Sequence, residues 1–449
     1  MHSTAMSAPR SFIRVVTFQP PLGRNQWHMK ELLILGAGTA GTIMANRLRR
    51  RLNPAQWRIR IVDEHPTHYY QPGFLFLPFG IYQPKDVVRP RRRLFAPGVE
   101  YIEARAEQIE PDRNRLHLAD GRSLPYDALI IATGTQPVPA QVEGMLGDDW
   151  GRRTFEFYTF DGARRLAEQL HQWRGGRLVV HVSEMPIKCP VAPLEFVFLA
   201  DWWLQMRGLR HRTELLFVTP LPGAFTKPVA ARLLSELLER KRVQVVPDFA
   251  VARVDNQRHC LVSWDNREVP YDLLVTVPPN LGAEVIERSG LGDEMNFVPT
   301  DRHTLQARGH ANIFVLGDAT DLPTSKAGSV AHFQAEVLTE NLLAFARHEP
   351  FPARFDGHAN CFVETGFHKA ILLDFNYHLE PVPGRFPLPH LGPLRLLGES
   401  RLNHWGKMAF LWIYWHLLLP GRSIPFVHHQ MSLAGKQIPA GALKPETVG

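Results

Sequence analysis

Short, uninterrupted runs of apolar residues recur along the chain and predict strands that are buried on both faces of a sheet. Three of these runs are residues 32–35, 129–132 and 313–316. Such runs are typical of parallel strands that helices cover on both sides. A further strand is expected at residues 58–62, and a helical stretch at residues 42–51 separates it from the first run, so the N-terminal part has the order strand, helix, strand.

A glycine-rich turn, GAGTAG at residues 36–41, joins the first predicted strand to this helix. Gly36 is expected to allow the tight turn, Gly38 to let a pyrophosphate approach the backbone, and Gly41 to permit close packing of helix on strand. The helix N-terminus attracts phosphate, and Asp63 at the end of the second strand is placed to bind a ribose hydroxyl. The pattern therefore predicts a dinucleotide-binding site.

Two other predicted strands end in turns of small or polar residues. The run at 129–132 leads into Thr133 and Gly134. The run at 313–316 leads into Gly317 and Asp318. Both turns are candidate cofactor contacts.

The chain between these turns predicts a second α/β domain inserted into the first. Its strands are expected at residues 178–182, 215–218 and 273–277, with proline-rich joints near 136–140 and 277–280. We therefore predict an α/β protein with two Rossmann-like domains and a membrane-associating C-terminal region. The predicted divisions are an N-terminal extension (1–29), a first dinucleotide-binding domain (30–140 and 290–350), a second Rossmann-like domain (141–289) and a C-terminal domain (351–449).

Composition narrows the functional classes. The 449 residues are 45% hydrophobic and 21% charged, which excludes a mainly disordered chain. The net charge of +7 is spread along the chain, so an anionic membrane surface is a better partner than nucleic acid. Three cysteines without metal-ligand spacing argue against a disulfide scaffold and against any metal site. No apolar run reaches the ~18–20 residues of a membrane span.

The two ends of the chain differ from the rest. Residues 1–29 contain three arginines and no acidic residue; they are either a targeting peptide or an extended start before Met29, which we favour. Residues 408–419 (MAFLWIYWHLLL) are too short to cross a bilayer, so we expect an amphipathic helix in a membrane interface, with a core helix as the alternative. The aromatic cluster and basic fringe of this region are Trp405, Trp412, Tyr414 and Trp415, with Arg395, Arg401, Lys407 and Arg422.

The strand at residues 178–182 ends where a nicotinamide-dependent enzyme needs a second glycine turn. Residues 183–190 (SEMPIKCP) contain no glycine, so we infer an electron donor other than NAD(P)H. Cys189 lies beside Lys188 at an expected helix start, and both features lower the pKa of a thiol. Cys361 is the second candidate thiol, whereas Cys260 is typical of a buried strand residue without a chemical role.

Four segments together resemble the sulfide:quinone oxidoreductases, which are flavoproteins with two dinucleotide-binding domains. They are residues 68–73 (HYYQPG), 186–189 (PIKC), 317–326 (GDATDLPTSK) and 361–366 (CFVETG). The PTSK run is similar to the mitochondrial-type branch of the family. The bacterial branch with an additional N-terminal cysteine is a poorer match, because no cysteine precedes Lys188. The resemblance therefore implies FAD that is bound without a covalent link.

The resemblance implies that Cys189 and Cys361 meet over the flavin as a sulfur-bridged pair. Sulfide attacks the bridge, displaces one thiolate and leaves a persulfide on the other cysteine. By resemblance Cys189 lies beside the flavin and Cys361 carries the sulfane sulfur, although the sequence is equally compatible with exchanged roles. An acceptor such as glutathione or sulfite then removes this sulfur.

Other roles follow from the same resemblance and from charge. Asp318 is expected to accept a hydrogen bond from the ribityl chain. Lys326 is expected near the pyrimidine edge of the flavin, with a solvated loop lysine as the alternative. Glu195, expected about two turns into the helix after residues 183–190, is either a proton shuttle or a surface carboxylate. The candidate walls of a quinone channel are Phe362, Tyr377 and Phe410.

The predicted function is FAD-dependent oxidation of sulfide, with electrons passed to a membrane quinone. The protein is expected to be peripheral on the bacterial inner membrane or the mitochondrial inner membrane. One alternative is a sulfide dehydrogenase subunit that reduces a cytochrome, against which the aromatic tail argues. A second is a type II NADH:quinone oxidoreductase, which needs the missing glycine turn. A flavin-binding protein without turnover is a third, and it needs no pair of cysteines.

Overall fold

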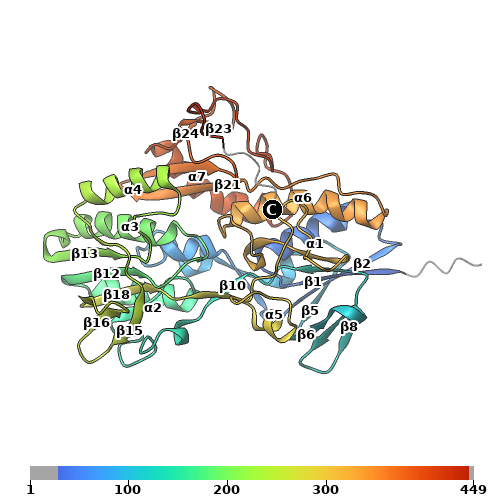
Figure 1. Ribbon diagram of the computed structural model, residues 1–449, viewed down its shortest axis with the longest axis horizontal. Helices are drawn as coiled ribbons and strands as arrows, with labels where there is room; N and C mark the ends of the chain where they lie inside the picture. Colours follow the sequence, from blue (N-terminus) through green and yellow to red (C-terminus); the bar gives the residue numbers. More distant parts are fainter. Residues whose placement is uncertain (1–28, 444–449) are drawn as a thin grey trace, which may run out of the picture.

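The computed structural model of the protein describes residues 29–443. Its first sheet, at the right in Figure 1, has five parallel strands in the order β20-β9-β1-β2-β5. These strands are β1 (Lys30–Leu35), β2 (Trp57–Asp63), β5 (Val99–Glu103), β9 (Ala128–Ile131) and β20 (Ile313–Val315). The strands predicted at residues 32–35, 58–62, 129–132 and 313–316 are therefore confirmed.

The central strand β1 shows why these runs are continuous. Its residues Leu32 and Ile34 belong to the core that includes α1 (Thr39–Arg51) and α6 (Gly328–Ala346). Leu33 and Leu35 face the opposite core, which is closed by the antiparallel sheet β6 (Ala106–Glu110), β7 (Arg115–Leu118) and β8 (Ser123–Pro125) and by α5 (Glu284–Arg288). Successive residues of a strand point to opposite faces, and because both faces of β1 are covered, its residues from Leu32 to Leu35 are all buried and apolar.

A second parallel sheet, at the left in Figure 1, has the order β11-β18-β12-β13-β14. Its strands are β11 (Thr154–Phe155), β12 (Gly176–Val182), β13 (Thr213–Val218), β14 (Gln244–Val246) and β18 (Leu273–Val277). The elements around it are α2 (Phe160–Gln172), α3 (Ala192–Met206), α4 (Pro228–Arg240), β15 (Val251–Asp255), β16 (Cys260–Ser263) and β17 (Glu268–Pro270). Two α/β sheets thus confirm the predicted fold class.

Antiparallel strands β10 (Thr135–Pro137) and β19 (Asn280–Gly282) pair where the chain passes between the two sheets. This pair lies between the two lobes in Figure 1. Its position falls at the two proline-rich joints of the sequence. The exact domain boundaries at residues 140, 289 and 350 stay predictions.

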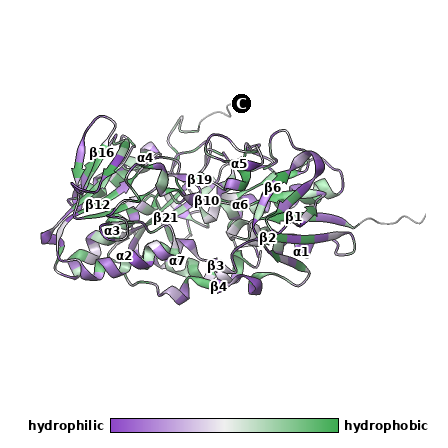
Figure 2. Ribbon diagram, turned by 90° about the horizontal axis from the view of Figure 1, so that it is seen from below, coloured by the Kyte–Doolittle hydropathy of each residue, from purple (hydrophilic) through white to green (hydrophobic). Residues whose placement is uncertain are grey.

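The C-terminal part forms a third layer above both lobes in Figure 1. Its sheet has the order β21-β22-β24-β23, with β21 (Ala359–Gly366), β22 (Lys369–Phe375), β23 (Gly384–Phe386) and β24 (Leu394–Leu396). Helix α7 (Arg401–Ile413) packs on this sheet and continues into a π-helical turn, η8 (Tyr414–Leu418). Seen from below, α7 lies at the edge of the molecule near β3 (Thr67–Tyr69) and β4 (Val88–Pro90) (Figure 2).

Short 3-10 helices connect these elements. They are Gln71–Phe76, Pro84–Asp86, Arg91–Leu94, Pro111–Arg113, Pro139–Gln141, Arg210–Arg212 and Gly317–Ala319. Within residues 29–443, each helix is too short or too polar to cross a bilayer. The predicted N-terminal extension lies outside the described residues, apart from Met29.

Two glycines of the first turn allow a matched test of the fold. A Cβ at Gly41 would lie 1.9 Å from the carbonyl oxygen of Gly36, whereas a Cβ at Gly38 meets nothing within 4 Å. We expect Gly41→Ala to lower the free energy of unfolding by about 1–3 kcal/mol because backbone must move. Gly38→Ala is expected to change it by less than about 0.5 kcal/mol. Urea unfolding of the cofactor-free protein measures both, and equal losses would contradict the packing.

Candidate active site

A cavity of about 720 Å³ lies between the carboxyl ends of the first sheet and the C-terminal layer. Pockets of this size commonly hold cofactors and substrates. All the residues predicted to bind the cofactor line it except Gly41, which packs behind the turn: Gly36, Gly38, Asp63, Thr133, Gly134, Gly317, Asp318 and Lys326. Cys189 and Cys361 line the same cavity.

The turn between β1 and α1 presents backbone donors to this cavity. Gly36 has a φ of +97°, which favours glycine, and its amide donates to the carbonyl oxygen of Val62 at 2.9 Å. Gly38 precedes α1 without a side-chain cap and faces open space. The first amides of a helix have no partners within the helix, and they attract anions. The turn is therefore suited to a phosphate group.

Asp63 stabilises this turn from the end of β2. Its Oδ2 accepts a hydrogen bond from the Ala37 amide at 2.7 Å, and its carboxylate pairs with Arg91. The side chain is 15% exposed and reaches the cavity. Asp63 therefore both positions the turn and remains within reach of a ligand, whereas the sequence suggested only the second role.

The two other predicted turns also face the cavity. Gly134 has a φ of +68°, and the neighbouring Thr133 Oγ1 is buried without a hydrogen-bond partner in the described part of the chain. Gly317 has a φ of +73°, and its amide donates to Gln334 Oε1 at 2.6 Å. Burial raises the pKa of Asp318, and Lys326 and Lys188 lower it. An unsatisfied buried hydroxyl is a position where a ligand replaces the missing partner.

Lys326 is a buried lysine, so the alternative of a solvated loop lysine is wrong. It is 7% exposed, and its Nζ donates to the carbonyl oxygens of Asp318 at 2.9 Å and Thr320 at 2.8 Å. The ammonium also lies 3.6 Å from the ring centroid of Phe297. Burial lowers the pKa of Lys326 to about 8, against the raising effect of Asp318. Lys326 thus positions the Gly317 turn while lining the cavity.

Cys189 reaches the cavity from the segment that precedes α3. It has a φ of +49°, and its amide donates to the carbonyl oxygen of Lys326 at 2.7 Å. Its own carbonyl accepts from the Tyr158 hydroxyl at 3.2 Å and from the Ala192 amide at 2.9 Å. The chain that follows β12 is therefore held against the first domain, where it presents a thiol.

Cys361 reaches the same cavity from β21, where it pairs with Leu373 of β22. It is 8% exposed, and both thiols are free. Cys260 is also a free thiol, but it begins β16 and lies away from the cavity lining. Two of the three cysteines, distant in the sequence, are thus brought together.

The prediction of a lowered thiol pKa at Cys189 is wrong. Burial raises the pKa of Cys189 well above its ordinary value, with Glu195 raising it further and Lys407 lowering it. Burial likewise raises the pKa of Cys361 to about 12, with the same opposing effects of Glu195 and Lys407. Helix α3 begins only at Ala192, and Lys188 Nζ donates to Gln71 Oε1 at 3.1 Å. Desolvation therefore outweighs the helix terminus and the adjacent cation.

A buried charge network connects the elements that carry the two thiols. Glu195 is 1% exposed in the first turn of α3, so the predictions of a surface carboxylate and of a position two turns into the helix are wrong. Its Oε1 accepts from the Glu364 amide of β21 at 2.6 Å and pairs with Lys407 of α7. Lys407 Nζ also donates to the carbonyl oxygen of Phe362 at 3.1 Å. The sequence showed Lys407 only as part of a basic fringe.

The aromatic tail divides into buried and exposed residues. Trp405 and Trp412 are 64% and 59% exposed, whereas Tyr414 and Trp415 are buried. The Tyr414 hydroxyl is 2.7 Å from Thr39 Oγ1, at the start of α1, and 2.7 Å from His68 Nε2 in β3. The prediction that all four aromatic residues form one interfacial cluster is therefore wrong, because Tyr414 and Trp415 pack inside.

The predicted quinone-channel walls are only partly in place. Phe362 and Phe410 line the cavity. Tyr377 lies elsewhere: its hydroxyl donates to the carbonyl oxygen of Arg302 at 3.3 Å, and its ring contacts that of Phe355. The prediction for Tyr377 is therefore wrong. The sequence does not distinguish an aromatic residue that packs on a loop from one that lines a channel.

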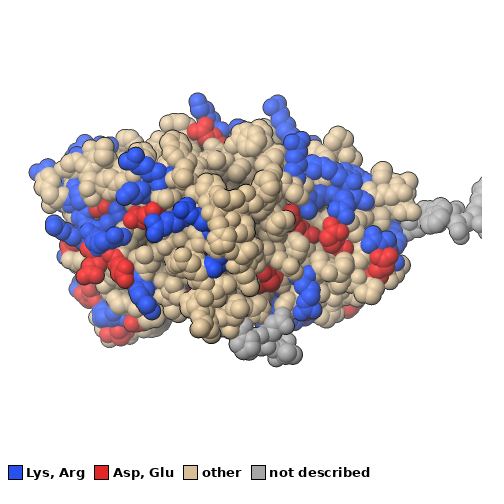
Figure 3. Space-filling view, turned by 90° about the horizontal axis from the view of Figure 1, so that it is seen from above, with Lys and Arg blue, Asp and Glu red and all other residues tan. Residues whose placement is uncertain are grey.

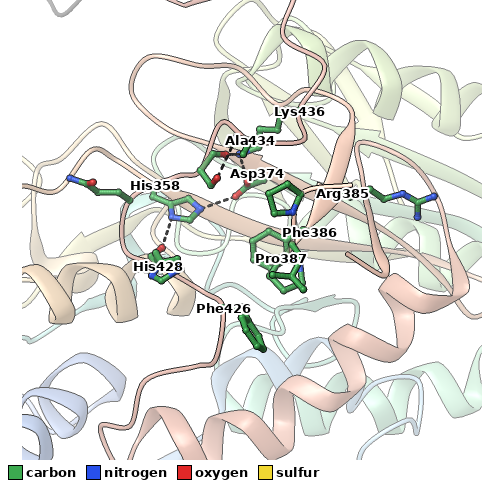
Figure 4. Close-up of a pocket in the computed structure, with 13 residues that line it drawn as sticks. His358, Asp374, Arg385, Phe386, Pro387, Phe426, His428, Ala434 and Lys436 are labelled. Carbon is green, nitrogen blue, oxygen red and sulfur yellow. Dashed lines mark hydrogen bonds and ion pairs between the residues drawn. The ribbon is translucent and has the colours of Figure 1, made fainter. Parts of the chain in front are cut away.

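A smaller cavity of about 180 Å³ lies in the C-terminal layer and shares Phe386 and Pro387 with the main one (Figure 4). His358 Nε2 is 2.8 Å from Asp374 Oδ1, and Lys436 Nζ is 2.6 Å from Asp374 Oδ2. His358 Nδ1 is 3.2 Å from the carbonyl oxygen of His428. Because these polar groups hydrogen-bond and pair with one another, they stabilise the C-terminal layer. Across residues 29–443, no cluster of metal-ligating side chains is present.

Comparisons with known proteins show what the chain is similar to. Residues 30–180 match the family model described as pyridine nucleotide-disulphide oxidoreductase. The mitochondrial sulfide:quinone oxidoreductases of Mus musculus and Dictyostelium discoideum are 26% and 28% identical to this chain. The alignments cover 93% and 88% of this chain and 95% and 87% of the relatives.

A solved structure has the same fold over most of its length. The sulfide:quinone oxidoreductase of the hyperthermophilic bacterium Aquifex aeolicus superimposes with a TM-score of 0.73 at 21% identity, covering 88% of this chain and 92% of that one. The fold, the glycine turn and the two cavity thiols agree with the resemblance found in the sequence. Over most of its length, the chain is therefore similar to mitochondrial sulfide:quinone oxidoreductases in sequence and to a bacterial one in fold.

Proposed function

We propose that this protein oxidises sulfide to protein-bound sulfane sulfur and passes the electrons to a membrane quinone. The observation that carries the proposal is that Cys189 and Cys361, from different elements, line the cavity that also holds the dinucleotide turn. A protein that only bound a flavin would need neither thiol there. The name of its relatives states the same two substrates.

FAD bound without a covalent link is the cofactor we propose. The open face of Gly38, the free amides at the start of α1 and the unpartnered Thr133 Oγ1 fit a dinucleotide. Asp318 and Lys326 are proposed to face its flavin half, since both line the cavity beyond the glycine turn. When bound, a flavin supplies two-electron redox chemistry that links sulfide to quinone.

The chain's own residues handle the sulfur. With Cys189 and Cys361 bridged, hydrosulfide attacks the Cys361 sulfur, the bridge bond breaks, and Cys189 leaves as a thiolate. Lys407 favours this thiolate, since it lowers the pKa of both cysteines against the effect of burial. The outer sulfur of the Cys361 persulfide then passes to a nucleophilic acceptor, for which glutathione and sulfite are candidates. We assign the carrier role to Cys361 by resemblance.

The NADH-dependent alternative fits the structure less well. In place of a glycine turn after β12, the chain runs back to the first domain, where Lys188 and Lys326 form a backbone bridge and Cys189 enters the cavity. The segment that would hold a second pyrophosphate therefore positions Cys189 instead. We propose sulfide as the only electron donor.

The surface of α7 supports peripheral binding to a membrane. Leu402, Trp405 and Trp412 are more than half exposed on one face of this helix, and Leu391 nearby is 84% exposed. Arg401 and Arg422, at the two ends of this segment, are exposed. Seen from above, the molecule carries Lys and Arg, with some Asp and Glu, on both sides of a largely uncharged middle (Figure 3). An apolar face with basic flanks suits the interface of an anionic bilayer, such as the bacterial or mitochondrial inner membrane. This arrangement favours quinone over a soluble cytochrome as the acceptor.

The first prediction concerns the two thiols. We expect sulfide to bleach the flavin of the anaerobic protein and decylubiquinone to restore it. Cys189→Ser and Cys361→Ser are each expected to lower sulfide-dependent quinone reduction on the order of 10⁴-fold while flavin stays bound. Cys260→Ser is the matched control and is expected to retain full activity. Rapid bleaching by NADH, or none by sulfide, would contradict the proposed function.

The second prediction concerns the charges beside the thiols. Glu195→Gln removes a carboxylate that raises the pKa of Cys189 and Cys361, so the pKa of both thiols is expected to fall. Lys407→Gln removes the cation that lowers these values, so the opposite shift is expected. The pH dependence of iodoacetamide labelling, in reduced protein carrying Cys260→Ser, measures both.

The control for this pair is Glu184→Gln, which changes a half-buried carboxylate in the segment before Cys189. It is expected to leave the labelling profile unchanged. Shifts of Glu195→Gln and Lys407→Gln in the same direction would show that the network acts through packing rather than charge.

The third prediction concerns membrane binding. Replacing both Trp405 and Trp412 by serine removes two large exposed apolar side chains, so binding to anionic vesicles is expected to weaken by about tenfold or more. Trp264→Ser is the control, since Trp264 is 76% exposed on the second domain, far from α7 in sequence. Vesicle flotation measures both variants, and equal binding by the double variant would exclude α7 as the contact.

A further inference from the structure

The cavity wall contains a histidine that takes no part in the sulfur chemistry. His332 lies on α6, is 1% exposed and lines the cavity. Neither of its ring nitrogens has a hydrogen-bond partner among the described residues. A buried polar group without a partner costs free energy. The ring is therefore available to a ligand that occupies the cavity.

The C-terminal segment supplies the apolar side of this cavity. Its lining residues are Ile413, Leu418, Ile424, Pro425 and Val427. The segment packs on α1, which contacts the helix of His332, α6: the side-chain amide of Asn46 on α1 donates to the carbonyl oxygen of Leu419 at 2.7 Å. It also continues directly from α7, the proposed membrane contact. A quinone that enters from the bilayer thus meets an apolar wall with His332 behind it.

Two titratable side chains connect His332 with the surface. Glu336, one turn later on α6, has Oε1 3.8 Å from His332 Nε2 and Oε2 3.7 Å from His429 Nδ1. A small side-chain rotation or one bridging water closes gaps of this length. The exposed fraction of the side chain rises from 2% at His332 to 12% at Glu336 and 35% at His429. The three groups therefore form a graded series from cavity to solvent.

Other charges face the same group. Arg47 of α1 places Nη1 3.5 Å from Glu336 Oε1, and Glu340 of α6 acts on Arg47 in turn. Burial lowers the pKa of His332 to about 4, with Glu336 raising it and Arg47 lowering it, so the ring is neutral near pH 7. A neutral imidazole has one donor and one acceptor nitrogen. It passes on a proton by releasing one from the first while gaining one at the second.

We propose that His332, Glu336 and His429 deliver protons from solution to the quinone as it is reduced. The inference rests on the proposed function. A quinone that accepts the two electrons released by sulfide also takes up two protons, and an O–H bond forms at each carbonyl oxygen. His332 hydrogen-bonds one of these oxygens through one ring nitrogen and releases that proton as its other nitrogen takes up a proton from Glu336. Glu336 rests as a carboxylate, because the effect of burial is outweighed by His429, His332 and Arg47, which lower its pKa, so it first receives this proton from solution through His429.

The test separates the two halves of turnover in the holoenzyme. His332→Leu and Glu336→Gln are compared with His171→Gln, a control on the exposed face of α2. Sulfide is expected to bleach the flavin of all three at the wild-type rate. Reoxidation by decylubiquinone is expected to slow about 100-fold in His332→Leu and about tenfold in Glu336→Gln. In both variants, the rate of reoxidation is expected to fall further as the pH rises, because the concentration of protons in solution falls.

Quinone binding supplies a readout that does not depend on turnover. The Kd of the oxidised protein for decylubiquinone, measured by quenching of tryptophan fluorescence, is expected to rise about 5–10-fold in His332→Leu, because one hydrogen bond is lost. Glu336→Gln is expected to leave this Kd unchanged, because Glu336 acts through His332.

Reoxidation of the variants at the wild-type rate would overturn the inference, and so would an unchanged Kd in folded His332→Leu. If His332→Leu does not fold, the reoxidation rate and pH profile of Glu336→Gln test the inference instead. Glu336→Gln is expected to fold, since the side chain of Glu336 is partly exposed. A wild-type protein that sulfide does not bleach would instead contradict the proposed function, so the two failures are distinct.

Discussion

The buried carboxylate of Glu195 joins the three segments on which the proposed chemistry depends. It lies in α3, accepts a hydrogen bond from the Glu364 amide of β21 and pairs with Lys407 of α7. A buried charge is costly unless it is paired and hydrogen-bonded, so loss of one partner from this network destabilises the packing of these elements. Because Cys189 directly precedes α3 and Cys361 lies in β21, the same network brings the two thiols to one cavity.

The C-terminal segment carries both the exposed tryptophans of α7 and a buried contact with the dinucleotide turn. Trp405 and Trp412 project from α7 into solvent, whereas Tyr414, two residues after Trp412, hydrogen-bonds to Thr39 and His68 beside the dinucleotide turn. One continuous helix and π-helical turn thus reaches from the proposed membrane surface to the start of α1. A ligand entering from the bilayer therefore needs to travel only along this segment to approach the cofactor site.

Prediction from sequence succeeded where short-range rules decide. The turn at Gly36 needs a positive φ, and the overlap of a Cβ at Gly41 with the Gly36 carbonyl is set by the local path of the chain. Prediction from sequence failed where segments distant in the chain form the surroundings of a side chain. Tyr377 packs on a loop near residue 302 rather than in the cavity, and desolvation reverses the expected pKa shift of Cys189.

The sequence by itself determined the α/β architecture, the glycine turn and the family resemblance, because strand periodicity, backbone sterics and motif spacing are properties of neighbouring residues. Only the tertiary structure decided which charges surround the thiols, which aromatic residues of the tail are buried, and that His332 has no partner while Glu336 and His429 follow it outward. Burial and electrostatics depend on every group within a few ångströms, and packing brings most of those groups from elsewhere in the chain.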